Sequence, residues 1–172
     1  AQKPLPVYFA SYDSFVVENR YLVLPLGLSP KNVLEKSSSY SRGDHLDLEV
    51  IDLQTGEHHR VFNKSVALER WNLSFRAPEQ LRFPGILIIE ARTMDANHDG
   101  KLTWEDPIKL YGYDLGKHDL FPILPENYSL AKCMPVEDKL ILTLGAADGQ
   151  VSIYAYAPQT RAGRFVVEHL KP

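Results

Sequence analysis

The sequence predicts an all-β protein built from three antiparallel units of roughly four strands each. Short runs of β-branched and aromatic residues recur along the 172-residue chain, which contains nine Tyr and seven Phe, and such residues favour strands. A strand, a Gly-containing turn and a second strand follow one another three times, which is typical of hairpins. Another apolar strand precedes each hairpin, so one pattern is repeated. We expect one domain over residues 1–172.

The first unit covers approximately residues 7–63. Its expected strands are 7–12, 21–26, one that begins at residue 46 and turns before residue 57, and 58–62. The connection between the second and third strands, residues 28–44, is rich in Ser, and we expect a mobile loop there.

The second unit covers approximately residues 66–125. Its expected strands are 66–75, 86–89, 108–113 and 119–123. The run at 85–92 is β-branched and apolar, which indicates a buried strand. In this unit, residues 95–106 occupy the connection between the second and third strands.

The third unit covers approximately residues 128–170. Its expected strands are 128–136, 140–144, 151–157 and 164–168. Here the same connection is the tight turn at 146–149. In all three units the connection between the second and third strands thus occupies the same position, but its sequence differs from unit to unit, as a repeat architecture predicts.

Residues 95–106 read D-A-N-H-D-G-K-L-T-W-E-D and predict a metal-binding loop. Oxygen donors recur at alternate positions, and a Gly stands where the loop turns sharply. The expected ligands are three side chains at the start, a backbone carbonyl, a position often bridged by water and a closing carboxylate: Asp95, Asn97, Asp99, Lys101, Thr103 and Asp106. Oxygen donors of this number favour Ca²⁺ over Mg²⁺. An acidic surface turn is the alternative, because D-G and N-x-D-G form turns without any metal.

This loop resembles the calcium loop of the EF-hand and dockerin families. It departs from the commonest EF-hand pattern at Asp106, where those loops usually place Glu; the dockerin-like loops commonly use Asp. An EF-hand also needs a helix on each side, whereas strands are expected here. We therefore expect a structural calcium site rather than a helix–loop–helix switch.

The tandem four-stranded units resemble blades of a β-propeller. The phrase L-Y-G-Y-D-L at 110–115, which follows a strand and the D-x-N-x-D-G loop, is similar to WD-type and TolB-like repeats of bacterial exported proteins. A β-sandwich is the alternative, because it also produces short strands at regular spacing. Three blades would not close a ring, so the propeller-like fold implies a protein partner or a homo-oligomer that completes the assembly.

The composition restricts the classes of binding partner and the cellular compartment that we expect for this chain. The net charge of −3 with scattered Lys and Arg provides no basic patch for nucleic acid. No apolar stretch is long enough for a transmembrane helix, although association with a membrane complex remains compatible with the sequence. The chain begins without Met, which suits a mature exported protein, and calcium loops of modest affinity work outside the cytosol. We expect a periplasmic or extracellular location.

No residue pattern indicates catalysis, so we expect a non-enzymatic interaction or assembly module with structural calcium. His58 and His59 should face opposite sides of a strand and not share a metal. Trp104 is expected to pack as a lid beside the loop; if it were exposed, it would suit a calcium-dependent carbohydrate-binding module. An exported enzyme with an unidentified site is a further alternative. Cys133 is expected to be a free, mostly buried thiol.

Overall fold

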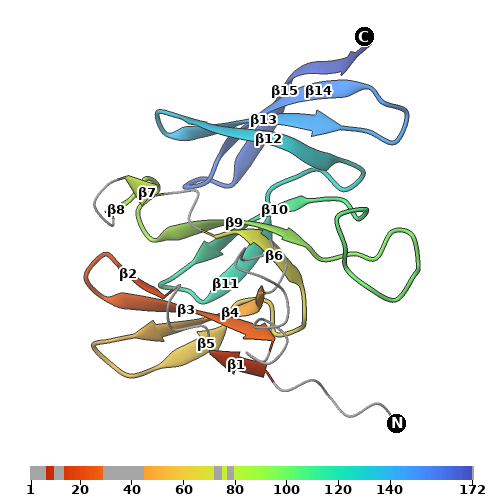
Figure 1. The fold of residues 1–172 in the computed structure, drawn as a ribbon. Helices are drawn as coiled ribbons and strands as arrows, with labels where there is room; N and C mark the ends of the chain where they lie inside the picture. Colours follow the sequence, from red (N-terminus) through yellow and green to blue (C-terminus); the bar gives the residue numbers. More distant parts are fainter. Residues whose placement is uncertain (1–6, 10–13, 29–44, 72–74, 77–79, 172) are drawn as a thin grey trace.

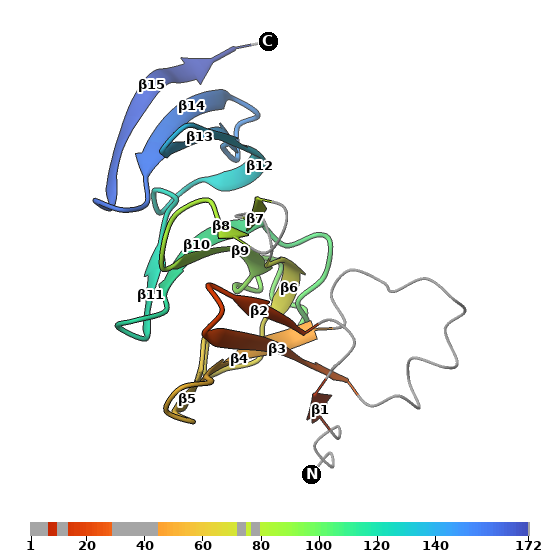
Figure 2. The ribbon, with the colours of Figure 1, turned by 90° about the vertical axis from the view of Figure 1, so that its left-hand side faces the viewer.

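The computed structural model describes residues 7–9, 14–28, 45–71, 75–76 and 80–171, and within them every regular element is a β-strand. The strands form three antiparallel sheets and one small hairpin. Figures 1 and 2 show the sheets stacked in the order of the chain, with the second between the first and the third. The predicted all-β class with three antiparallel units is confirmed. Within the described residues the sheets do not close into a ring.

The first sheet has the order β1-β3-β4-β5, and β2 also pairs with β3. Its strands are β1 (Val7–Phe9), β2 (Phe15–Val17), β3 (Tyr21–Leu28), β4 (His45–Asp52) and β5 (His58–Arg60). The sequence did not indicate β2, which is only three residues long. Residues 29–44, which include most of the Ser-rich connection, lie outside the described part of the chain, as do residues 10–12 of the first expected strand.

The second sheet has the order β11-β10-β9-β6. Its strands are β6 (Ala67–Arg70), β9 (Ile86–Arg92), β10 (Lys109–Asp114) and β11 (Asp119–Pro122). A two-stranded hairpin of β7 (Phe75–Arg76) and β8 (Gln80–Leu81) stands between β6 and β9 in the chain. The single strand expected over 66–75 is therefore shorter than predicted.

The third sheet follows the chain in the order β12-β13-β14-β15. Its strands are β12 (Ser129–Val136), β13 (Lys139–Gly145), β14 (Val151–Ala157) and β15 (Ala162–Leu170). Because each strand pairs with the next along the chain, this unit is a simple meander, as the repeated pattern predicts.

Strand β9 explains how the stack is held together, because all seven of its residues are buried. Alternate residues of a strand face opposite sides of a sheet. Leu87 and Ile89 therefore pack toward the first sheet, while Ile86 and Ile88 belong to the cluster shared with the third sheet. Burial on both faces accounts for the continuous apolar run in the sequence.

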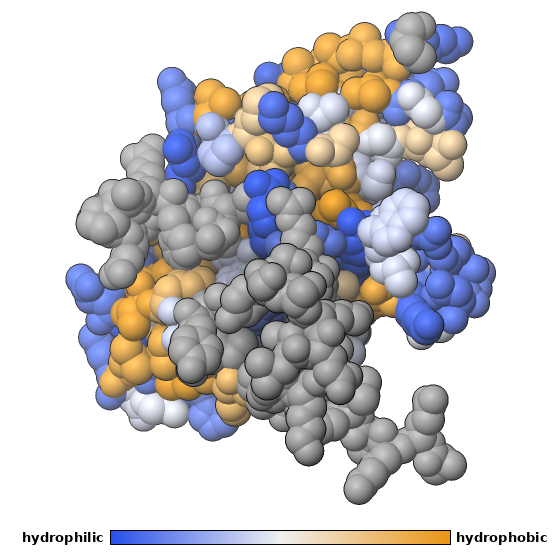
Figure 3. Space-filling model, viewed as in Figure 1, coloured by the Kyte–Doolittle hydropathy of each residue, from blue (hydrophilic) through white to orange (hydrophobic). Residues whose placement is uncertain are grey.

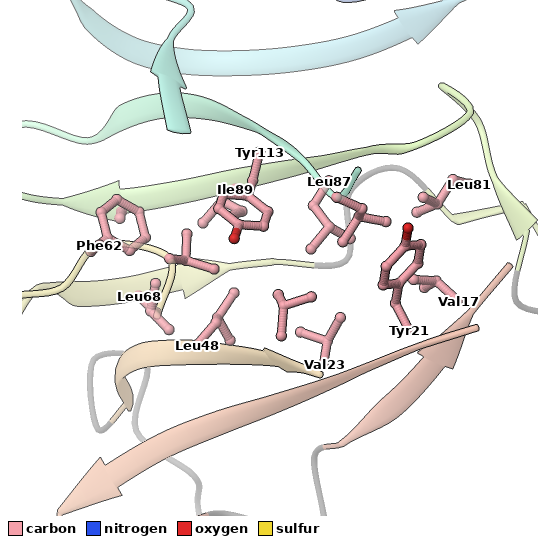
Figure 4. Packing of buried hydrophobic residues seen from close by; sticks show 14 of the residues in the cluster. Val17, Tyr21, Val23, Leu48, Phe62, Leu68, Leu81, Leu87, Ile89 and Tyr113 are labelled. Atoms are coloured by element: carbon pink, nitrogen blue, oxygen red, sulfur yellow. The ribbon is translucent and has the colours of Figure 1, made fainter. Parts of the chain in front are cut away.

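The first and second sheets share one hydrophobic core, shown in Figure 4. Val23 and Leu48 from the first sheet meet Leu87 and Ile89 from the second, and the ring of Tyr113 lies among them. A second core joins the second and third sheets and includes Leu140, Leu142 and Leu144 of β13. Within the described residues no helix is long and apolar enough to span a membrane.

Candidate metal-binding loop

The loop at residues 95–106 joins two neighbouring strands of the second sheet. It follows β9 and precedes β10, and these strands pair antiparallel, with Lys109 opposite Ala91 at the loop's base. Figure 1 shows the loop projecting from the edge of the stack in green. The strands expected on both sides of the loop are confirmed, so the loop has a rigid sheet beneath it rather than two helices.

The first half of the loop folds back on its own side chains. The two carboxylate oxygens of Asp95 accept hydrogen bonds from the backbone N–H groups of Asp99 (3.2 Å) and Gly100 (2.8 Å). Asn97 Oδ1 accepts from Asp99 N (3.1 Å), and Asp99 Oδ1 accepts from Lys101 N (2.8 Å). Gly100 has a φ of 81°, which only glycine adopts at little cost. The glycine of the pattern is therefore required by the backbone conformation of the turn.

Asp106 closes the loop from inside the protein. It is only 2% exposed, and its two carboxylate oxygens accept the backbone N–H groups of Ala96 and Thr103, both at 2.8 Å. These bonds, first that from Thr103, lower the pKa of the Asp106 carboxyl below its usual value despite its burial. The side chain is therefore a carboxylate at neutral pH, and it ties the two ends of the loop together.

A hydrogen bond from Arg92 connects this closing residue to the sheet. Arg92, the last residue of β9, donates from its guanidinium to the backbone carbonyl of Asp106. The same guanidinium binds Glu69 of β6 at 2.9 Å, and the two side chains are 11% and 12% exposed. Across the base of the loop, the hydroxyls of Thr93 and Tyr111 lie 2.7 Å apart. The C-terminal end of the loop is thus positioned by buried polar contacts.

The donor set suits a hard cation. The loop offers three carboxylates, an amide oxygen and a hydroxyl, and Glu105 adds a carboxylate that accepts from Asn97 Nδ2 at 3.1 Å. The sequence pattern did not single out Glu105, because the eleventh position is not a usual ligand. Asp95, Asp99 and Asp106 do not bring one oxygen each within 4.8 Å of one another in the described structure. Ion binding therefore requires the exposed side chains at the start of the loop to turn toward Asp106.

The exposure of the Trp104 side chain differs from the expectation. Its side chain is 81% exposed, the largest exposed aromatic surface in the described residues, so the predicted packing lid is wrong. The indole belongs to the turn that leads into Asp106, where no neighbouring strand covers it. His98, at a loop position that supplies no ligand, is exposed.

The structure also shows where Cys133 and the adjacent histidines His58 and His59 lie. Cys133 is a free thiol that is partly buried against the second core, and burial raises its pKa to about 12. His58 and His59 point to opposite sides of β5, as predicted: His58 binds Glu49 at 2.6 Å and His59 binds Glu57 at 2.9 Å. The sequence did not indicate that His59 also meets His118, because that contact joins two different sheets.

Comparison with models of known protein families finds no match, and a search of curated proteins finds no relative of this chain.

Proposed function

We propose that this chain is a non-enzymatic assembly module that functions outside the cytosol, stacks a further β-sheet onto its third sheet and uses calcium to stiffen the loop at 95–106. The observation that supports assembly is the outer face of the third sheet. The second sheet is covered on both faces, whereas the third sheet packs against it with only one.

The register identifies the outer face. Leu140, Leu142 and Leu144 are fully buried against the second sheet, so Ile141 between them faces away. Its cross-strand partners are Met134 and Ala155, and Ile153 on the same face pairs with Val167. The face that looks outward thus has an apolar centre of Met134, Ile141, Ile153 and Val167.

Exposure of large apolar side chains is concentrated at this sheet. Of nine large exposed hydrophobic residues among those described, five lie on β12 and β15: Met134, Val136, Val166, Val167 and Leu170, which are 39–50% exposed. Figure 3 shows apolar side chains gathered over the third sheet at the top of the view. Contiguous exposed apolar surface of this kind marks interaction sites. Three exposed cationic side chains, Lys132 of β12, Lys139 of β13 and Arg164 of β15, border this apolar centre on the same face.

The occupant that suits this face best is a sheet from a second copy of the chain. The face has the size and alternation of the faces already paired within the chain, so another four-stranded sheet would complete it. Two copies with three sheets each would supply six sheets, within the range of about four to eight blades that closes a propeller. The same contact repeated twice satisfies two-fold symmetry.

Sedimentation equilibrium tests this assembly. The wild-type chain should have twice the chain mass, and a double variant with Met134→Glu and Val167→Glu should be monomeric. Met94→Glu is the matched control, because Met94 is 50% exposed after the end of β9, in the second sheet, which the proposed contact does not include. A folded wild-type protein that stays monomeric at high concentration would rule out a second copy as the occupant.

The calcium part of the proposal is supported by the donor chemistry and by the anchoring of Asp106. A bound ion would neutralise the carboxylates gathered in one short loop. It would also hold the half-buried Asp95 and the exposed Asn97 and Asp99 against a sheet that is already rigid. Its contribution would be structural, because nothing in the loop is placed to act as an acid or a base on a substrate. Extracellular calcium, which is abundant, suits a loop whose ligands must reorganise.

Calcium-dependent carbohydrate binding is a second candidate, supported by the exposure of Trp104. A flat, 81% exposed indole beside a metal loop is suited to stacking on a sugar ring. A glycan array read with calcium and with chelator tests it. Binding that needs calcium and is lost in Trp104→Ala would favour this function over assembly alone.

A further inference from the structure

A second group of metal-ligating side chains lies at the junction of the first and second sheets. Ligand atoms of Glu57, His59 and His118 lie within 4.8 Å of one another. Glu57 directly precedes β5 and His59 lies within it, whereas His118 ends the turn between β10 and β11. The tertiary fold thus gathers two imidazoles and a carboxylate from segments about sixty residues apart.

We propose that Glu57, His59 and His118 form a site for a borderline transition-metal ion, Zn²⁺ or a similar divalent cation, that joins the first sheet to the second. Two imidazole nitrogens and a carboxylate oxygen are ligands that such ions prefer, whereas calcium takes oxygen donors. The site is therefore chemically distinct from the loop at 95–106.

The contacts of the two rings support a ligand at this place. Their centroids lie 3.8 Å apart with an interplanar angle of 28°, and His59 Nε2 is 2.9 Å from Glu57 Oε1. Nδ1 of His118 is buried and has no hydrogen-bond partner among the described residues. Ring stacking alone would explain the contact, but it leaves this nitrogen unsatisfied, which is costly in a buried position.

The turn before His118 is closed by backbone hydrogen bonds, whereas the side chains of His59 and Glu57 are partly exposed. The turn that carries it is closed by Asp114 Oδ1, which accepts the backbone N–H groups of Gly116 (3.0 Å) and Lys117 (2.9 Å). The side chains of His59 and Glu57 are 37% and 58% exposed. Because a metal binds in the plane of an imidazole ring, the ring of His59 must rotate out of the stack, and its exposure allows that movement.

The site is accessible from solvent. His59 and His118 both line a surface hollow of about 850 Å³, which also contains Phe9, Leu24 and Arg60. An ion can therefore enter without unfolding of either sheet. Three protein ligands leave a fourth position of a tetrahedral ion for water or another ligand.

Isothermal titration with Zn²⁺, in the presence of excess calcium to saturate the acidic loop, tests this site on the full chain. The wild type should bind one zinc ion per chain, and His59→Gln and His118→Gln should each weaken binding at least about tenfold, the loss that even outer-shell changes cause. His58→Gln is the matched control, because His58 lies on the same strand but faces Glu49. Wild-type affinity in that control is expected.

Two further measurements make the test decisive. Glu57→Gln changes an exposed side chain, so it tests the ligand set even where a His variant fails to fold. Zinc should raise the unfolding temperature of the wild type but not of Glu57→Gln or His59→Gln. Absence of zinc binding by the wild type, or equal affinity in all variants, would overturn the proposal.

Discussion

The ring of Phe121 lies directly over Gly112, its cross-strand partner in the second sheet. A Cβ at residue 112 would come within 2.2 Å of Phe121 Cζ. The ring has little room to move, because it is 6% exposed and the guanidinium of Arg161 lies 3.9 Å from its centroid. This contact gives a physical reason for the Gly inside a strand.

Gly112→Ala should therefore destabilise the protein by about 1–3 kcal/mol, the usual cost of overpacking a filled core. Urea unfolding measures the change. Gly116→Ala is the control, since a Cβ there would only reach ordinary contact with Asp114 Oδ1 at 3.7 Å. Equal stability of the two variants would show that the ring of Phe121 moves aside freely.

Calcium should stabilise the wild type by about 1.4 kcal/mol at ten times its dissociation constant, if the unfolded chain does not bind the ion. Asp95→Ala and Asp99→Ala should each abolish this response, because they remove direct ligands. Thermal unfolding with chelator and after calcium is restored measures it. Asp148→Ala is the control. Asp148 lies in the Asp–Gly turn between the second and third strands of the third unit, where its Oδ1 accepts a hydrogen bond from Gln150 N at 3.0 Å. An unchanged unfolding temperature in the wild type would contradict the calcium site.

Arg92→Leu should cost about 3 kcal/mol, because it leaves the carboxylate of Glu69 buried without its partner. Glu69→Gln should also destabilise the protein. The two variants should differ in calcium affinity. Only Arg92 binds the backbone carbonyl of Asp106, so only Arg92→Leu should weaken calcium binding measured by titration. Equal calcium affinities would show that this bond does not position the loop.

Asp52 should make stability depend on pH in the acidic range. The guanidinium of Arg20 donates two hydrogen bonds to its carboxylate, at 2.6 and 3.1 Å, and lowers the pKa of Asp52 to about 2. Because the folded pKa lies below the unfolded value, the stabilisation is present above about pH 4 and is lost as the pH falls toward 2. The difference in unfolding midpoint between wild type and Asp52→Asn should therefore shrink over that interval. A difference that stays constant would contradict the assignment.

Cys133 should react slowly with thiol reagents in the folded protein. The thiolate is the reactive form, and burial raises the pKa of this thiol to about 12. Labelling at mildly alkaline pH should be much faster after unfolding in urea. Rapid labelling of the native protein would show that the strand β12 opens readily.

Much of the fold was predictable from local patterns. The alternation in residues 140–144 and 151–157 predicted β13 and β14, since a sheet with one covered face imposes a period of two. The apolar run of β9 indicated burial on both sides. Short or interrupted strands were harder to predict: β2, β7 and β8 have two or three residues, too few to show a period.

The loop at 95–106 was predictable as a turn with oxygen donors, because its residues are contiguous and their spacing is visible in the sequence. Its exposed Trp104 was not predictable, since exposure depends on whether another element covers the indole. The role of Arg92 was equally hidden: its partners, Glu69 and Asp106, come from a different strand and from the far end of the loop.

The sequence by itself thus determined the strand periodicity, the three repeated units and the chemical character of the loop, all of which depend on residues close together in the chain. Only the tertiary structure decided which faces are covered and which histidines meet. His59 lies beside His118 because the first sheet stacks on the second, and Leu140, Leu142 and Leu144 are buried because the third sheet packs against the second. Contacts between distant segments arise from the packing of whole sheets, which no local pattern encodes.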